Sequence, residues 1–136
     1  MKRFKELLSQ LKRLNLPNEQ YAVFGSGPLA IRGLRESNDI DIIVKPRLWK
    51  ELIKKYPVYN KEKLSIKVGD IEIFNNWLPW IKDSETLIDD ADIFNGIRFV
   101  KLKYVLIWKK AFGREKDKED IRLIEDYLKE SGELSK

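Results

Sequence analysis

Two carboxylates on one predicted strand have a spacing that suits metal binding. Asp39 and Asp41 flank Ile40 in a run of alternating apolar residues, and a third carboxylate follows later, where Glu72 lies between two isoleucines. Side chains on a strand alternate between its faces, so Asp39 and Asp41 point the same way, about 7 Å apart at the backbone. Their like charges repel each other unless cations neutralise them. The spacing therefore predicts a pair of divalent metal ions held by these carboxylates.

The residue types that the chain lacks narrow the chemistry further. It has no cysteine and no histidine, so thiolate and imidazole ligands are excluded, as are Ser-His-Asp and Cys-His catalysis. Oxygen ligands alone suit hard ions such as Mg²⁺ or Mn²⁺. A pair of such ions can activate an attacking hydroxyl, hold a triphosphate and stabilise the departing pyrophosphate.

A turn that precedes the predicted metal strand can bind phosphate. Gly25 and Ser26 come directly before a predicted helix. Free backbone N–H groups at a helix N-terminus and a serine hydroxyl can bind phosphate oxygens, and glycine allows close approach to the backbone. We assign Ser26 to the terminal phosphates, and Asp39 and Asp41 to both metals. Glu72 is assigned to the metal that activates the acceptor hydroxyl.

Each of these residues also has a purely structural interpretation. Asp39 and Asp41 could be solvated residues on the exposed face of an antiparallel strand. Ser26 could be a helix N-cap, and Glu72 a surface residue paired with a lysine. Taken singly, the structural interpretations are favoured. The coincidence of all these residues in this order favours a functional site.

The elements that must position these residues follow from local patterns. Helical periodicity and helix-stop residues predict an opening helix that ends before Pro17, a helix carrying Leu29 to Leu34, one from Pro46 to before Pro57, and closing helices over 102–112 and 118–130. Alternation and turn signals predict strands over 21–24, 38–44 and 96–100, and a hairpin of 64–67 and 71–74. Residues 75–95 are predicted to pack irregular or short helical segments onto the core. These elements predict an α+β fold with a mixed sheet flanked by helices.

Length and charge set the broad class of protein. The 136 residues, 43% of them hydrophobic, fit one domain with one core. The opening residues are charged and no segment is long enough to span a bilayer, so we expect a cytoplasmic protein without a membrane partner. The net charge of +5 favours polyanionic partners such as nucleotides, tRNA or DNA. A lysine-coated surface, as in many heat-adapted proteins, explains that charge equally well.

The segment from Gly25 to Val44 resembles the signature of the DNA polymerase beta-like nucleotidyltransferases. That signature is a strand, Gly-Ser, a helix of about a dozen residues and then Asp-hydrophobic-Asp on a strand, and here twelve residues separate Ser26 from Asp39. The family's third carboxylate lies between hydrophobic residues on a later strand, a place that Glu72 fills. Asp70, at the predicted turn, is the competing residue. The resemblance implies one domain over 1–136, with a catalytic core over about 20–100 and a helical part over about 101–131.

The carboxyl-terminal part is similar to small bacterial and archaeal members of that family, including toxin-type enzymes of abortive-infection systems. Lys109 and the run 114–120 occupy the places of that group's helical lysine and Arg-X-Lys-Asp-X-X-Asp run. The resemblance implies that Lys109 lies near the nucleotide phosphates, with Arg114 and Lys116 as weaker candidates for the same anion. For Asp117 and Asp120 we prefer helix capping.

The resemblance implies an enzyme that moves a nucleoside monophosphate from an NTP to an acceptor hydroxyl and releases pyrophosphate. The acceptor, whether tRNA, a protein or a small molecule, would be recognised by a dimer partner, by another protein, or by base stacking on Trp77, Trp80 and Trp108. For Trp108 we prefer core packing. One alternative is a non-catalytic domain of the same fold that binds nucleotide or nucleic acid. Another is a toxin-type transferase controlled by an antitoxin.

Overall fold

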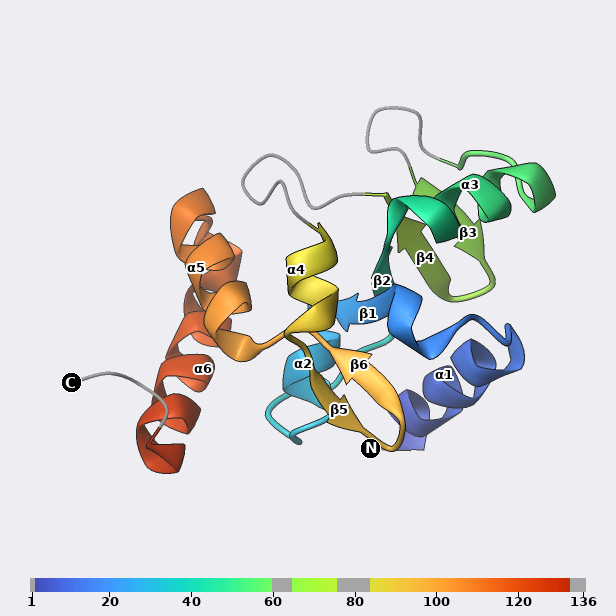
Figure 1. Cartoon of the computed structure of the whole chain (residues 1–136). Helices are drawn as coiled ribbons and strands as arrows, with labels where there is room; N and C mark the ends of the chain where they lie inside the picture. The colour runs from blue at the N-terminus through green and yellow to red at the C-terminus, as the bar shows by residue number, and fades with distance from the viewer. Residues whose placement is uncertain (1, 60–64, 76–83, 133–136) are drawn as a thin grey trace.

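Six short strands form one sheet in the described part of the chain. The computed structural model describes residues 2–59, 65–75 and 84–132. Its strands are β1 (Tyr21–Phe24), β2 (Ile40–Val44), β3 (Ser65–Val68), β4 (Ile71–Phe74), β5 (Asp92–Phe94) and β6 (Ile97–Phe99) (Figure 1). Their order across the sheet is β3-β4-β2-β1-β6-β5, with β2 parallel to β4, β1 parallel to β6 and the other neighbours antiparallel. The predicted α+β fold with a mixed sheet is therefore confirmed.

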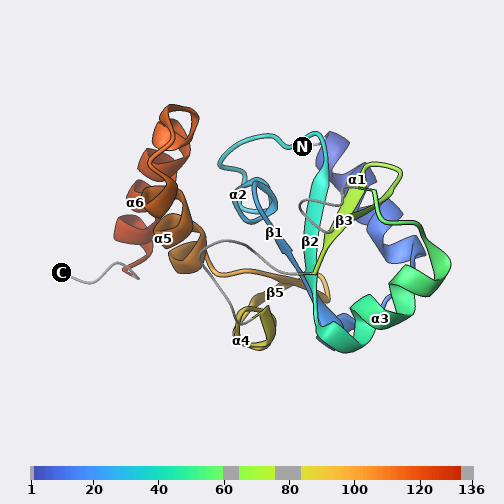
Figure 2. The same cartoon turned by 90° about the horizontal axis from the view of Figure 1, so that it is seen from above.

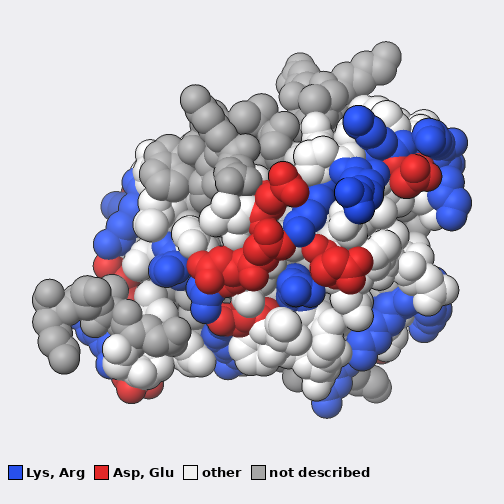
Figure 3. Space-filling model, in the orientation of Figure 1, with Lys and Arg blue, Asp and Glu red and all other residues white. Residues whose placement is uncertain are grey.

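Helices α1 (Lys2–Arg13) and α3 (Pro46–Lys55) lie on one side of this sheet (Figure 2). Each presents an apolar stripe to the strands and polar residues to solvent, as helical periodicity requires. In the view of Figure 3, lysine and arginine side chains gather on the right, over these two helices. The core on this side includes Phe4, Leu7, Leu11, Leu48 and Leu52 from the helices, and Ile40, Ile42 and Val44 from β2.

The other side of the sheet is covered by α4 (Ser84–Asp89), α5 (Leu102–Phe112) and α6 (Lys118–Ser131) (Figure 2). The short α2 (Gly27–Ala30) follows β1 and packs into both cores, with Ala30 in the first and Leu29 in the second. Two short 3-10 helices, η1 (Asn18–Gln20) and η2 (Glu115–Asp117), precede β1 and α6. The second core lies on this side and includes Phe24, Leu29, Ile43, Leu87, Ile88, Val105, Ile124 and Leu128. Within the described ranges, none of the helices combines the length and the apolar character needed to cross a bilayer.

Most of the predicted elements are present with nearly the predicted bounds. α1 ends at Arg13, before Pro17, and α3 runs from Pro46 to Lys55. β3 and β4 form the predicted hairpin around Gly69, whose φ is +61°. The packing predicted for Leu87 and Ile88 is also confirmed, since both are buried in the second core.

The helix after the Gly-Ser turn is shorter than predicted. α2 ends at Ala30, because the chain turns at Gly33, whose φ is +73°. The Gly33 amide donates to the Ala30 carbonyl at 3.0 Å, and the Leu34 amide donates to the Leu29 carbonyl at 3.0 Å. This pair of hydrogen bonds is the glycine-ended helix stop known as the Schellman motif. The glycine therefore stops the helix before Leu34, which was predicted to lie within it.

Strand β5 lies in the region that was predicted to form irregular or short helical segments, and that prediction is wrong for Asp92–Phe94. It pairs with β6 through a tight turn at Asn95 and Gly96, which have φ values of 53° and 79°. Two consecutive residues with positive φ are the requirement of the commonest two-residue hairpin turn, and Asn-Gly is its preferred sequence. The Asn-Gly dipeptide was therefore the signal for this hairpin. The predicted strand over 96–100 is confirmed as β6.

Candidate functional site

The pairing of β2 with β4 places two of the three predicted metal ligands, Asp41 and Glu72, next to each other. Asp39 lies immediately before β2 and is exposed, whereas Asp41 is half-buried within the strand. Ile40 between them is fully buried on the opposite face. In the parallel pairing of β2 with β4, Asp41 is the direct partner of Glu72. Directly paired residues in neighbouring strands lie about 4.8 Å apart on the same face. Asp41 and Glu72 are therefore adjacent.

A serine that was not identified from the sequence contacts Glu72. Ser65 is fully buried on β3, and its Oγ donates a hydrogen bond of 2.6 Å to Oε2 of Glu72. A hydrogen bond to one carboxylate oxygen restricts the rotation of the side chain. Ser65 therefore orients Glu72. Its sequence signal is weak, because a serine at the start of a strand is common.

The turn after β1 approaches the same carboxylates. Phe24, the last residue of β1, pairs with Asp41, so the chain leaves β1 beside this side chain. Gly25 follows with a φ of +69°, and a Cβ at this position would lie 3.0 Å from Oδ2 of Asp41. The backbone conformation and the close carboxylate both require glycine here. Gly27 is required for packing, because a Cβ there would collide with Val23.

The hydroxyl of Ser26 connects this turn with the start of β2. Ser26 is at the N-cap position of α2, but its side chain makes no capping hydrogen bond. Its Oγ lies 2.7 Å from Oγ of Ser37, which donates a 2.7 Å hydrogen bond to the backbone carbonyl of Asp39. Because Ser37 has one hydroxyl proton, Ser26 is the donor in the first bond. The N-cap interpretation of Ser26 is therefore wrong. With only four residues, α2 also adds little helix dipole to a phosphate site.

Asp70, the competing third carboxylate, contacts a different helix. Its Oδ2 accepts hydrogen bonds from Arg3 at 2.9 Å and from Gln10 at 3.4 Å, and both donors belong to α1. These contacts, with Arg3 contributing most, hold the pKa of Asp70 below its usual range. Asp70 is therefore directed toward α1, and Glu72 is the carboxylate beside Asp41.

Two of the predicted phosphate-binding cations have carboxylate partners. Lys109 is buried, and its Nζ lies 3.1 Å from Asp117 and 3.3 Å from Asp120. Arg114 donates from Nε to Asp117 at 2.6 Å, and its guanidinium lies 5.0 Å from the ring centre of Trp108. The nucleotide-binding role of Lys109 and Arg114 stays a prediction, since phosphate would have to replace these carboxylates.

The aspartates that pair with Lys109 were expected to cap α6. Asp117 is at the N-cap position, but its side chain makes no capping hydrogen bond, so this expectation is wrong. Burial raises the pKa of Asp117, yet the hydrogen bonds from Arg114 and Lys109 outweigh burial and hold the pKa below its usual range. Asp120 is also buried and accepts hydrogen bonds of 3.0 and 2.8 Å from Nη1 of Arg35. The network therefore connects α5 and α6 to the segment before β2.

The tryptophans were considered as a base-stacking surface. Trp108 is partly buried against the second core and makes an edge-to-face contact with Phe112, at 4.7 Å between ring centres. The core packing predicted for Trp108 is therefore confirmed. Trp77 and Trp80 lie outside the described residues, so base stacking on them stays a prediction.

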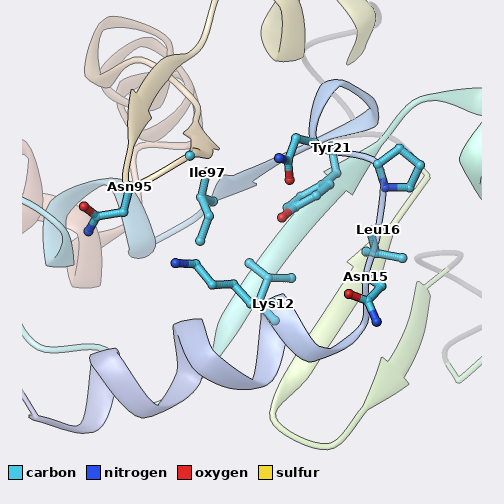
Figure 4. Close-up of a pocket in the computed structure, with 10 residues that line it drawn as sticks. Lys12, Asn15, Leu16, Tyr21, Asn95 and Ile97 are labelled. Atoms are coloured by element: carbon cyan, nitrogen blue, oxygen red, sulfur yellow. The ribbon is translucent and has the colours of Figure 1, made fainter.

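A cavity of about 450 Å³ lies at the opposite end of β1 from the Gly25 turn (Figure 4). Its lining residues include Lys12, Asn15, Leu16, Tyr21, Asn95 and Ile97. Burial raises the pKa of Tyr21. Asn15 and Asn95 each have a φ of 53°, but one follows the end of α1 and the other is in the β5–β6 turn, where asparagine commonly adopts this conformation. Local structure therefore accounts for these two residues.

The carboxylates are the stronger candidate site, although they are not gathered into a closed metal centre. Across the described ranges, no group of three or more carboxylate, thiol or imidazole side chains is arranged to hold a metal ion. No protein-family model, no curated protein and no solved structure matches this chain. The chemistry of the residues themselves is therefore the basis for a functional proposal.

Proposed function

We propose that this protein is a metal-dependent nucleotidyltransferase that transfers a nucleoside monophosphate from an NTP to an acceptor hydroxyl. The acceptor oxygen forms a bond to the α-phosphorus, the bond from that phosphorus to the β-bridging oxygen breaks, and pyrophosphate leaves. The hydroxyl proton is released to water. Bound Mg²⁺ or Mn²⁺ ions would activate the hydroxyl and neutralise the charge of the triphosphate.

The observation that carries the proposal is that the Gly25 turn lies beside a pair of carboxylates from different strands. Asp41 is paired with Phe24 on one side and with Glu72 on the other, and Gly25 leaves room for its carboxylate. Cation ligands next to backbone groups that can bind an anion are the combination that phosphoryl transfer needs. Solvated strand carboxylates would need no glycine of positive φ beside them.

The residues of the site fit hard divalent cations. Their donor atoms are carboxylate and hydroxyl oxygens, which Mg²⁺ and Mn²⁺ prefer. We assign Asp39 and Asp41 to both ions and Glu72, oriented by Ser65, to the ion on the acceptor side. Asp39 is exposed, so its side chain is able to rotate toward a bound ion.

Calorimetric titration with ATP, CTP, GTP and UTP in Mg²⁺ tests this proposal. We expect the native chain to bind at least one NTP in a metal-dependent way. The Asp39→Ala/Asp41→Ala variant should bind it at least about tenfold more weakly, because the cations that offset triphosphate charge lose their ligands.

The matched control is Glu119→Ala/Asp126→Ala, which removes the same charge from the exposed face of α6. It should bind the NTP as the native chain does. If no NTP binds in a metal-dependent way, or if both double variants lose binding equally, the transferase proposal fails. Circular dichroism of the variants separates loss of binding from loss of folding.

A further inference from the structure

The positive charge of this protein is concentrated on one side of the sheet. From Arg3 onward, α1 carries four basic side chains and one acidic side chain. α3 likewise carries four basic side chains and one acidic side chain. These two stretches have a formal charge of +6, whereas the whole chain has +5, so the remaining residues sum to −1. Their exposed cations, here named the basic face, are Lys5, Lys12, Arg13, Arg47, Lys50, Lys54 and Lys55.

Few carboxylates neutralise the basic face at close range. In the described part of the chain, its one ion pair joins Lys54 to Glu51 at 3.6 Å, with both side chains mostly exposed. On the opposite side of the sheet, Lys110 lies 2.7 Å from Glu125. In Figure 3, basic side chains lie over α3 and α1, and a band of acidic side chains crosses the middle of the view. The basic face is therefore available to an external polyanion.

The arrangement of apolar residues argues against a lipid surface as that polyanion. A helix that lies in a membrane interface inserts its apolar side into the lipid. The apolar stripes of α1 and α3, such as Leu7 and Leu52, are buried against the sheet instead. The twelve residues of α1 span about 18 Å, which matches roughly five phosphates of one strand whose bases are stacked at a rise of about 3.4 Å.

An exposed aromatic residue lies close to the end of α3. Tyr59 is 61% exposed, the largest exposed fraction of any large hydrophobic side chain in the described residues. Nζ of Lys67 lies 5.5 Å from its ring centre, and its backbone amide donates to the carbonyl of Ser65 at 2.7 Å. An exposed aromatic ring next to a lysine is a combination on which unpaired bases stack.

We propose that the basic face and Tyr59 bind a single-stranded nucleic acid, with the cations on its phosphates and the Tyr59 ring against a base. The binding itself is independent of catalysis. That this nucleic acid is also the acceptor rests on the proposed transferase function. Arg3 supports this link, because it contacts the Asn38 carbonyl at 3.5 Å and Asp70 at 2.9 Å, so α1 begins beside the entry to β2. A strand bound along α1 would bring its end close to Asp39.

Fluorescence anisotropy with labelled single-stranded RNA and DNA of about 16 nucleotides, the upper end of common site sizes, tests the proposal. It is measured on the full chain in EDTA without NTP, over a series of salt concentrations. We expect binding that weakens with salt. Lys50→Gln/Lys54→Gln should reduce affinity about tenfold or more at low salt and lower the slope of log K against log salt by about 1.4, for two lost phosphate contacts.

Two further variants test whether binding depends on the basic face rather than on the net charge of the protein. Lys118→Gln/Lys129→Gln removes the same charge from exposed positions of α6, and its affinity should stay within about twofold of native, since it touches no proposed phosphate contact. Tyr59→Ala should reduce affinity about fivefold or more while leaving the salt slope unchanged, because stacking is lost but no charge is.

Several outcomes would overturn the proposal. These are no binding of either oligonucleotide at low salt, equal losses in the two lysine double variants, or equal binding of polyglutamate or anionic vesicles. Tighter binding of RNA than of DNA, or of DNA than of RNA, would support the proposal and identify the natural ligand. Asp39→Ala/Asp41→Ala should bind oligonucleotide like the native chain, so failure of the transferase proposal would leave this result intact.

Discussion

The helices on the two sides of the sheet use their lysines and arginines differently. The cations of the basic face are exposed, and the ion pairs within α1 and α3, Arg3–Glu6 and Lys54–Glu51, are 3.8 and 3.6 Å long. Arg3, which is half-buried, also pairs with Asp70 at 2.9 Å. On the α5/α6 side, Lys109 is buried between two aspartates at 3.1 and 3.3 Å. The sequence patterns of the two regions are similar, since both mix basic and apolar residues at helical spacing.

The difference shows that a cation acquires its role from its surroundings. A buried charge must be paired, because it has lost its water, and its partners then connect segments of the chain. Asp120 does so between Lys109 and Arg35. An exposed cation keeps its water and contributes little to stability, but it remains able to attract an anion. We therefore expect the buried Lys109 and its aspartate partners to matter for stability, and the exposed cations of the basic face to matter for binding.

The largest expected effect on stability comes from Asp120→Asn. The substitution leaves the buried Lys109 with one carboxylate and removes the negative charge that pairs with Arg35. We expect the free energy of unfolding to fall by about 3 kcal/mol, as when a buried ion pair loses one partner. Urea unfolding measures it. Asp126→Asn, at an exposed pair on the same helix, should change stability by less than about 0.5 kcal/mol, and equal effects would contradict the comparison.

The next effect is a pH dependence that comes from Asp117. Its folded pKa lies below the ordinary value because Arg114 and Lys109 outweigh burial. The stabilisation is therefore complete above the unfolded pKa of about 3.9 and is lost as pH falls through the lower folded pKa. Between about pH 5 and pH 2, native stability should fall more steeply than that of Asp117→Asn. Urea unfolding at several pH values gives both slopes, and parallel slopes would disprove this role.

The smallest expected effect is that of Glu51→Gln on the basic face. Glu51 is exposed and its pair with Lys54 is long, so unfolding free energy should change by less than about 0.5 kcal/mol. Removing a negative charge from this face should instead strengthen binding of single-stranded oligonucleotide, by about twofold. Thermal unfolding and anisotropy measure the two effects. A clear loss of stability would mean that the exposed cations also have structural roles.

Elements with strong local signals could be predicted from the sequence. The apolar spacing of α1 and the prolines around α3 specified both helices, and the β3–β4 hairpin followed from Gly69 and the alternation beside it. The short α2 was predicted too long because the stop at Gly33 was not recognised. β5 was not predicted, although the Asn-Gly dipeptide between β5 and β6 is the preferred sequence of a two-residue hairpin turn.

The candidate site was predictable only in part. The shared face of Asp39 and Asp41 follows from strand alternation, and the Gly25 turn was visible as a motif. The roles of Ser37 and Ser65 were not visible, because each depends on a hydrogen bond that forms only after the strands and the turn are in place. Capping by Asp117 was the wrong prediction because a buried lysine from another helix is a stronger partner than backbone amides.

By itself, the sequence determined the helices and strands that short repeating patterns specify, the oxygen-only chemistry of any metal site, and the excess of positive charge. The tertiary structure decided that Glu72 rather than Asp70 lies beside Asp41, that Lys109 is enclosed by aspartates, and that the exposed cations gather over α1 and α3. The physical reason is the distance along the chain over which each kind of interaction acts. Periodicity and turn chemistry act within a few residues, whereas strand pairing and burial depend on the packing of segments that are distant in the chain.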